Sequence, residues 1–310
     1  MRSARIGRDA LWLSTLLLVC VACGAGVTRP VRRVPATAPE QPRTAPAASD
    51  APRAIDPSRF TTGACMAFPP TTVPRHRTVF LDAGHGGRDP GAVGSTESGR
   101  TVYEAAQTLP VELDAMAMLR AAGFQVVVSR TRDTSVLRLG PDDVSGALLT
   151  PEGSHEDVLA RDVCADEAHA NLLVGIYFNA GGSANAGAVT GYDAVRPFAD
   201  QNLRFARLLQ ADVLAAMNAR GWRIPADGVK SDVGLGSALT AQALAYGHLT
   251  LLGPFSRSYV STPSRMPGAL IEPLFITDQF EGSIAASRDG QQVIAGGLAK
   301  AVEQYFAPGA

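Results

Sequence analysis

From residue 77 onward, short apolar segments alternate with amphipathic ones, and this alternation constrains the fold more than any other feature. Composition and β-branched content predict strands at 77–84, 124–130, 172–177, 187–195, 248–253 and 268–276. Apolar residues at helical spacing predict helices at 103–123, 155–171, 198–221 and 290–306. We therefore expect an α/β fold: a single domain whose twisted, mostly parallel or mixed sheet of about six strands is flanked by helices on both faces.

The N-terminus has the pattern of an export signal. Three arginines precede the apolar run 11–22, which is too short to span a bilayer comfortably. We interpret residues 1–23 as a signal peptide. Ala22, Cys23 and Gly24 resemble a bacterial lipoprotein processing site, which would leave Cys23 lipidated; cleavage without lipidation is the alternative.

The segment that follows, residues 24–60, is rich in proline and alanine and predicts a disordered tether before a folded domain at 61–310. That domain contains only Cys65 and Cys164. In an exported chain two cysteines favour a disulfide, with two separate buried thiols as the alternative. The formal net charge of −1, without a long basic run, gives no electrostatic reason to expect nucleic acid.

Three residues stand out as candidates for chemistry. His85 lies between glycines directly after the first predicted strand, and Glu104 opens the next helix 19 residues later. Glu272 lies inside the apolar run ALIEPLF, where an ionised carboxylate is costly unless it is paired or bound to metal. Without a partner, His85 could belong to an ordinary glycine-rich turn, and Glu104 could simply favour the helix dipole.

Six segments together resemble the zinc-dependent N-acetylmuramoyl-L-alanine amidases of the Amidase_3 type, cell-wall hydrolases. They are LDAGHGGRDPGAVG (81–94), the helix opened by Glu104, VVVSRTRD (126–133), VLAR (158–161), VGIYFNA and ALIEPLFIT, in the family's order over residues 77–306. The resemblance implies that His85 and Glu104 are zinc ligands and that Glu272 is the catalytic base. It also places Asn179 at a matching position of the strand-end motif S-I-H-x-N-A, where we expect a role in substrate binding.

The chain departs from the family at one position of that motif. Tyr177 occupies the place of a second histidine ligand. Phenol must lose a proton of pKa about 10 to coordinate well, so it is a poorer zinc ligand than imidazole. Either Tyr177 coordinates, or another residue substitutes; among His155, His169 and His248, only His155 lies in a segment, within 134–157, that could fold over the site.

The expected function is hydrolysis of the amide between N-acetylmuramic acid and L-alanine of the stem peptide by zinc-activated water. The substrate would be peptidoglycan in the cell envelope, reached by an exported chain that is membrane-attached if Cys23 carries a lipid. An activating protein partner is not identified by the sequence. The alternative is a zinc-deficient, non-catalytic protein of the same fold that binds peptidoglycan or regulates its hydrolysis.

Overall fold

The computed structural model describes residues 51–308 apart from 183–184 and 236–239. The predicted signal peptide 1–23, including Cys23, and most of the tether 24–60 lie outside the described residues. In the described part of the chain, none of the helices combines the length and apolar character needed to cross a membrane.

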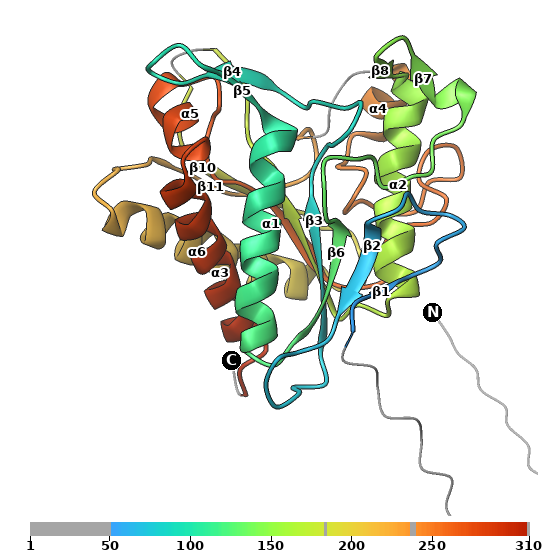
Figure 1. The fold of residues 1–310 in the computed structure, drawn as a ribbon, viewed down its shortest axis with the longest axis horizontal. Coiled ribbons are helices and arrows are strands. Elements are labelled where there is room, and N and C mark those ends of the chain that lie inside the picture. The colour runs from blue at the N-terminus through green and yellow to red at the C-terminus, as the bar shows by residue number, and fades with distance from the viewer. Residues whose placement is uncertain (1–50, 183–184, 236–239, 309–310) are drawn as a thin grey trace, which may run out of the picture. The chain divides into compact units, whose positions relative to one another are not determined.

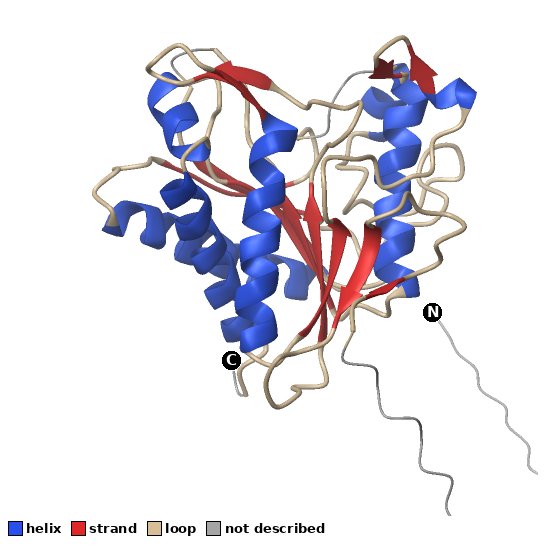
Figure 2. Cartoon of the chain, in the orientation of Figure 1, coloured by secondary structure: helices blue, strands red, loops and turns tan. Residues whose placement is uncertain are grey.

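A mixed, twisted sheet of eight strands forms the centre of the domain (Figures 1 and 2). Its spatial order is β1-β2-β6-β3-β9-β12-β10-β11, and the four central strands β6, β3, β9 and β12 run parallel. β10 runs antiparallel to β12, and β11 runs parallel to β10. The strands are β1 Arg53–Ala54, β2 Ala64–Phe68, β3 Thr78–Ala83, β6 Gln125–Arg130, β9 Leu172–Ile176, β10 Ala188–Tyr192, β11 Ala226–Ser231 and β12 Gly268–Glu272.

Helices cover both faces of this sheet. Helices α1, α3 and α6 lie on one face and α2 on the other (Figure 1). Along β3, Val79 and Leu81 pack into the core under the first group, whereas Phe80 packs into the core under α2. This alternation is what a strand buried on both faces requires. The helices are α1 Glu104–Ala121, α2 Pro151–Glu167, α3 Ala199–Ala219, α4 Ala241–Tyr246, α5 Gln279–Ala285 and α6 Arg288–Tyr305.

The predicted α/β class is confirmed, and several details are corrected. The main sheet has eight strands rather than about six, because β1, β2 and β11 were not anticipated. The segment 248–253, predicted as a strand, forms turns after α4. The folded part begins before residue 61: β1 pairs with β2, and Ile55 and Phe60 are buried in the core. The last residues of the predicted tether therefore pack on the domain because they carry apolar side chains.

Two short hairpins extend from the sheet at the start of helices. β4 (Val93–Ser95) pairs with β5 (Thr101–Tyr103), which leads directly into α1. The 3-10 turn η1 (Pro141–Asp143) leads into β7 (Val144–Ser145), which pairs with β8 (Leu148–Leu149) just before α2. The carbonyl of Gly146, at the tip of this second hairpin, accepts a hydrogen bond from Arg88 at 2.7 Å. Part of the predicted segment 134–157 thus contacts the loop that follows His85.

Cys65 and Cys164 form a disulfide, as predicted from the cysteine count. It joins β2 to α2, and both residues are fully buried in the core under α2. The bridge therefore fixes the N-terminal strand pair to the helix that covers the same face of the sheet.

Candidate active site

The four residues singled out by the family motifs gather at one edge of the sheet. His85 follows β3, Tyr177 follows β9, and Glu272 ends β12. These three strands are parallel neighbours, so their carboxyl ends meet at the same edge, where α/β proteins place their ligands. Glu104 reaches this edge as the first residue of α1.

His85 is held between two carboxylates. Its Nε2 lies 3.1 Å from Glu104 Oε2, and its Nδ1 lies 2.8 Å from Asp89 Oδ2. A histidine that binds metal through one ring nitrogen usually donates the proton on the other to a carboxylate or carbonyl. Asp89 supplies that carboxylate, and Nε2 is left facing Glu104. The sequence alone does not indicate this role for Asp89, although Asp89 lies in the same motif four residues after His85.

The backbone around His85 is shaped for this contact. His85 adopts a left-handed φ of 61°, which is uncommon for residues other than glycine and is found at constrained functional sites. Gly91, with φ of 66°, passes so close that a Cβ there would lie 2.7 Å from the His85 ring and 2.8 Å from Glu104. Glycine at position 91 is therefore required for His85 and Glu104 to meet.

Glu104 is buried and oriented by the backbone. Its Oε1 accepts a hydrogen bond from the Phe178 amide, and its Oε2 accepts one from the Ala92 amide, both at 2.9 Å. Burial alone lowers the pKa of His85, but Glu104 and Asp89 outweigh it and raise that pKa to about 10. The two carboxylates thus create a place that favours a positive charge on or beside the imidazole.

Glu272, the last residue of β12, lies at the same edge of the sheet, near Glu104 and His85. Burial, and then the nearby charge of Glu104, raise its pKa to about 7, while His85 opposes the shift. No hydrogen bond to its carboxylate comes from the described part of the chain, and the residue is only partly buried. A carboxylate with these properties can accept a proton near neutral pH, which is the requirement for a general base.

Tyr177 is turned toward a different partner. Its hydroxyl donates a hydrogen bond to Asp82 at 3.0 Å, and its ring lies edge-on to His85 with centroids 5.4 Å apart. Burial and the neighbouring Asp82 raise the pKa of the phenol well above its ordinary value. The ring occupies the space beside Gly84, where a Cβ would lie 2.4 Å from it. Tyr177 is therefore a protonated hydrogen-bond donor in this arrangement.

A buried ion-pair network supports both Tyr177 and His85. Arg161, on α2, pairs with Asp82 and Asp157 and donates to the carbonyls of Ala83 and His85, each at 2.8 Å. The guanidinium thus holds the end of β3 and the backbone of the His85 loop. Its position in the VLAR segment was recognised from the sequence, but its partners were not.

His85 and Glu104, at this edge of the sheet, are placed to supply two donor atoms to a metal ion. The 3.1 Å between His85 Nε2 and Glu104 Oε2 is close to the roughly 3.3 Å expected between neighbouring ligands of tetrahedral zinc. Tyr177 does not fit as the third donor, because its hydroxyl is bonded to Asp82. Within the described residues, the single cluster of three potential His, Cys, Asp or Glu ligands lies elsewhere, at Asp193, Asp232 and His248.

The other histidines do not complete the pair. His155, on α2, stacks on Tyr259 with centroids 4.0 Å apart, and its Nε2 bonds the Tyr259 carbonyl. His169 is exposed just after α2, and His248 contacts Asp193 and Asp232. The alternative that His155 substitutes for the missing ligand gains no support from these contacts. Asn179 is at the edge as expected, but its Oδ1 accepts from the Ala180 amide.

The comparisons with known proteins agree with this arrangement. Residues 79–304 match the sequence model of the family described as N-acetylmuramoyl-L-alanine amidase. The chain belongs to this family. Hydrolysis of cell-wall amide bonds is the activity that this membership assigns to it, and dependence on zinc is typical of the family.

Three proteins similar to this amidase share 21–26% of their residues with it. The uncharacterized protein YqiI of Bacillus subtilis is 26% identical over 230 residues, which cover 74% of this chain and 85% of YqiI. An N-acetylmuramoyl-L-alanine amidase from Clostridium difficile 630 has the same fold, with a TM-score of 0.52 and 23% identity. The match covers 76% of this chain and 98% of the other. The CwlD amidase from Clostridioides difficile, solved in complex with the GerS lipoprotein, also has this fold, with a TM-score of 0.52 and 21% identity. The match covers 74% of this chain and 98% of CwlD.

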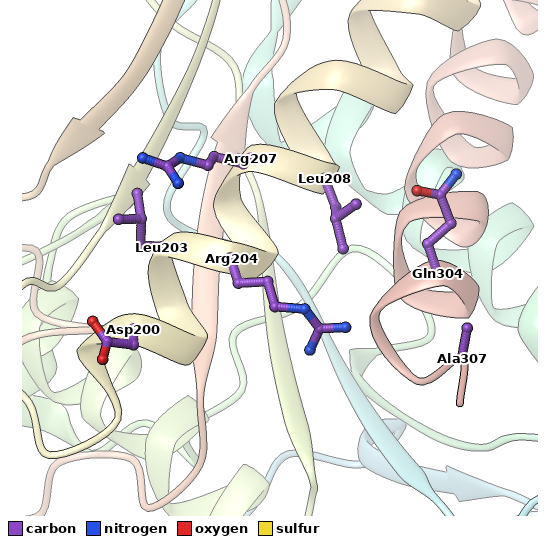
Figure 3. A pocket seen from close by; sticks show the side chains of 7 residues that line it. All are labelled: Asp200, Leu203, Arg204, Arg207, Leu208, Gln304 and Ala307. Atoms are coloured by element: carbon purple, nitrogen blue, oxygen red, sulfur yellow. The ribbon is translucent and has the colours of Figure 1, made fainter. Parts of the chain in front are cut away.

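A hollow on another part of the domain lies away from this edge. It has a volume of about 660 Å³ and is lined by α3 and the end of α6 (Figure 3). Arg204 and Arg207 from α3 and Gln304 from α6 border it. None of the residues of the amidase motifs contributes to its lining.

Proposed function

We propose that this amidase cleaves the amide between the lactyl group of N-acetylmuramic acid and L-alanine of the stem peptide, using His85, Glu104 and Glu272. The observation that carries the proposal is the meeting of the His85–Glu104 pair and Glu272 at one sheet edge, at the positions of the family motifs. A zinc ion held by His85 and Glu104 would polarise the scissile carbonyl and activate water.

The protein's own residues would handle the protons. Glu272 takes a proton from the attacking water as its oxygen bonds to the carbonyl carbon. The same carboxyl then gives this proton to the nitrogen of L-alanine as the C–N bond breaks. The products are the lactyl carboxylate and a stem peptide with a free amine. Asn179, half-buried at the same edge, is proposed to contact the substrate.

Two protein donors should hold zinc more weakly than the three that are usual for catalytic sites. Tyr177 fills the third position with a hydroxyl bonded to Asp82, so it would shape the pocket rather than bind the ion. We therefore propose an amidase whose metal dissociates readily and must be supplied during purification.

The cell envelope is the proposed location. The arginine-flanked apolar run 11–22 supports export, and Cys23 supports attachment through a lipid. An activating partner is also proposed, because a relative of the same fold was solved in complex with a lipoprotein.

Mass spectrometry of digested muropeptides would test the proposed bond. The full-length protein, with zinc supplied, should release stem peptides that begin with L-alanine and leave glycan strands carrying free lactyl groups. Release of shorter peptides that lack L-alanine would instead identify an endopeptidase. No release, together with binding to intact peptidoglycan, would support the non-catalytic alternative.

A further inference from the structure

A second cluster of ligand-type side chains lies beyond the ends of β10 and β11. Asp193 follows the last residue of β10, and Asp232 follows the last residue of β11. These strands are parallel neighbours, so both carboxylates emerge at the same end, and His248 reaches them from the turn after α4. Because β10 runs antiparallel to β12, this end of the strand pair is opposite to Glu272.

The three side chains converge on one point. Nδ1 of His248 lies 3.1 Å from Asp232 Oδ1 and 3.3 Å from Asp193 Oδ2. One ligand atom from each of the three residues lies within 4.8 Å of those of the other two. With zinc–nitrogen and zinc–oxygen bonds of about 2.0–2.2 Å, neighbouring ligands in a tetrahedral site are about 3.3–3.5 Å apart. The two histidine–carboxylate distances come close to this spacing.

One carboxylate oxygen in the cluster lacks a hydrogen-bond partner. Asp193 is fully buried, and its Oδ2, directed at His248, accepts no hydrogen bond in the described part of the chain. Its other oxygen accepts from the amides of Val195 and Arg196 at 2.8 and 2.7 Å, which fixes the orientation of the carboxylate. A buried carboxylate oxygen without a donor is costly, and a bound cation would satisfy it.

The charges in the cluster are also unbalanced. Asp193 and Asp232 are both fully buried, and within the described residues their only ion-pair partner is His248. The guanidinium of Arg196, close in sequence, donates to the carbonyls of Leu252, Gly253 and Ser264 instead. The backbone amide of Leu249 donates to Asp232 Oδ2 at 3.1 Å and helps to orient it. A divalent ion would neutralise the two carboxylates.

A small pocket borders the cluster at His248. This cavity has a volume of about 100 Å³ and is lined by His248, together with residues of α2 and α4 that include His155 and Ala243. The side chain of His248 is 17% exposed, whereas those of the two aspartates are fully buried. An ion could therefore enter past the imidazole and be held by the carboxylates behind it.

We propose that Asp193, Asp232 and His248 bind a divalent transition-metal ion, Zn²⁺ or a similar one, at a site distinct from the amidase centre. The donor set of two carboxylates and one imidazole suits such ions. The ion would join the ends of β10 and β11 to the turn after α4, and its effect would be on stability. The competing arrangement is a protonated His248 that bridges the two carboxylates without metal.

The substitutions His85→Gln and Glu104→Gln remove the ligands of the amidase centre. Zinc binding to full-length protein that carries both therefore reports on the second site alone. After removal of metal with EDTA, titration with zinc should give about one ion per chain and raise Tm by about 5 °C at a hundredfold excess over Kd. Adding Asp193→Asn, which keeps the shape of the side chain, should weaken zinc affinity by about 100-fold or more. Asp227→Asn is the matched control, because Asp227 is an aspartate on the neighbouring strand β11 but is exposed.

Two results would overturn the proposal. One is that the His85→Gln/Glu104→Gln protein binds no stoichiometric zinc. This result alone would be decisive, without any further variant. The other is zinc affinity that Asp193→Asn and His248→Gln leave unchanged. Tm is also measured in EDTA, so a variant that does not fold even without metal is recognised by its lack of a thermal transition. The zinc affinity of the other variant then decides whether the proposal holds. Amidase activity is not a readout here, so the proposed function can fail independently.

Discussion

The hydroxyl of Tyr177 donates a hydrogen bond to Asp82 at 3.0 Å, and Asp82 in turn pairs with the buried Arg161. The residue that replaces a histidine of the amidase motif is thereby tied to the end of β3 and to α2. The network stabilises the edge of the sheet that carries His85. It also leaves His85 and Glu104 as the two donors for a metal ion at this edge.

Replacing Tyr177 by histidine should restore a third donor. We expect Tyr177→His to raise zinc affinity at the amidase centre by on the order of 100-fold, and turnover at limiting zinc with it. Competition with a chromophoric chelator would measure the affinity, in protein carrying Asp193→Asn to silence the second cluster. Tyr177→Phe is the control, since it removes the hydroxyl without adding a nitrogen. Equal affinities in the two variants would show that position 177 does not face the ion.

Removing the charge of Arg161 should destabilise the domain strongly. Arg161→Met leaves Asp82 and Asp157 buried without their cation, which typically costs about 3–5 kcal/mol. The free energy of unfolding in urea would measure this loss. Arg288→Met breaks an exposed pair with Asp114 and should lower the free energy of unfolding far less, because water and salt screen such pairs. Similar losses in both variants would contradict the structural role assigned to the Arg161 network.

Amidase activity should rise with pH through about 7. Burial, followed by the charge of Glu104, raises the pKa of Glu272 to about 7, and only the ionised carboxylate can take a proton from water. Below this pH the protonated fraction grows and kcat/KM should fall. Tm measured over the same range would separate a loss of fold from a loss of base. A flat profile between pH 4 and 9 would exclude Glu272 as the base.

Removing the disulfide should lower stability without changing the fold. Cys65 and Cys164 are 99 residues apart, and a crosslink closing a loop of that length restricts the unfolded chain considerably. The variant with both cysteines changed to alanine should lose about 2–5 kcal/mol in guanidinium unfolding. A reducing agent should produce a comparable loss in the wild type and none in the variant. An unchanged midpoint in the variant would contradict this contribution.

The parts of the fold with strong local patterns could be predicted from the sequence. Strands β3, β6 and β9 each contain three consecutive large apolar residues, and α3 and α6 have a regular apolar face, so their positions were correct within a few residues. The segment 248–253 has the composition of a strand but forms turns, because its leucines contact the core under α2 instead of pairing in the sheet. β11 was missed because its residues ADGVKS are mostly polar and lie at the sheet's edge.

The residues of the candidate site also divide into those that the sequence indicates and those whose roles only the folded chain defines. Glu272 could be found because a carboxylate inside an apolar run is unusual for a structural residue, whereas His85 and Glu104 were identified by their places in the family motifs. The roles of Asp89, Asp82 and Arg161 depend on partners between 4 and 95 residues away, and only the folded chain defines them. Asp193, Asp232 and His248 are separated by long stretches of sequence without a motif. The place of His248 at the start of the predicted strand 248–253 gives no indication of this cluster.

The most direct test of the proposed amidase mechanism is the release of stem peptides from purified muropeptides by the full-length protein with zinc supplied. We expect the wild type to release peptides that begin with L-alanine and Glu272→Gln to release none, while Glu152→Gln, an exposed change on α2, leaves release unaffected. Equal release by wild type and Glu272→Gln would contradict the assigned base. No release by the wild type, with release appearing in Tyr177→His, would show that the chain has lost the activity of its family.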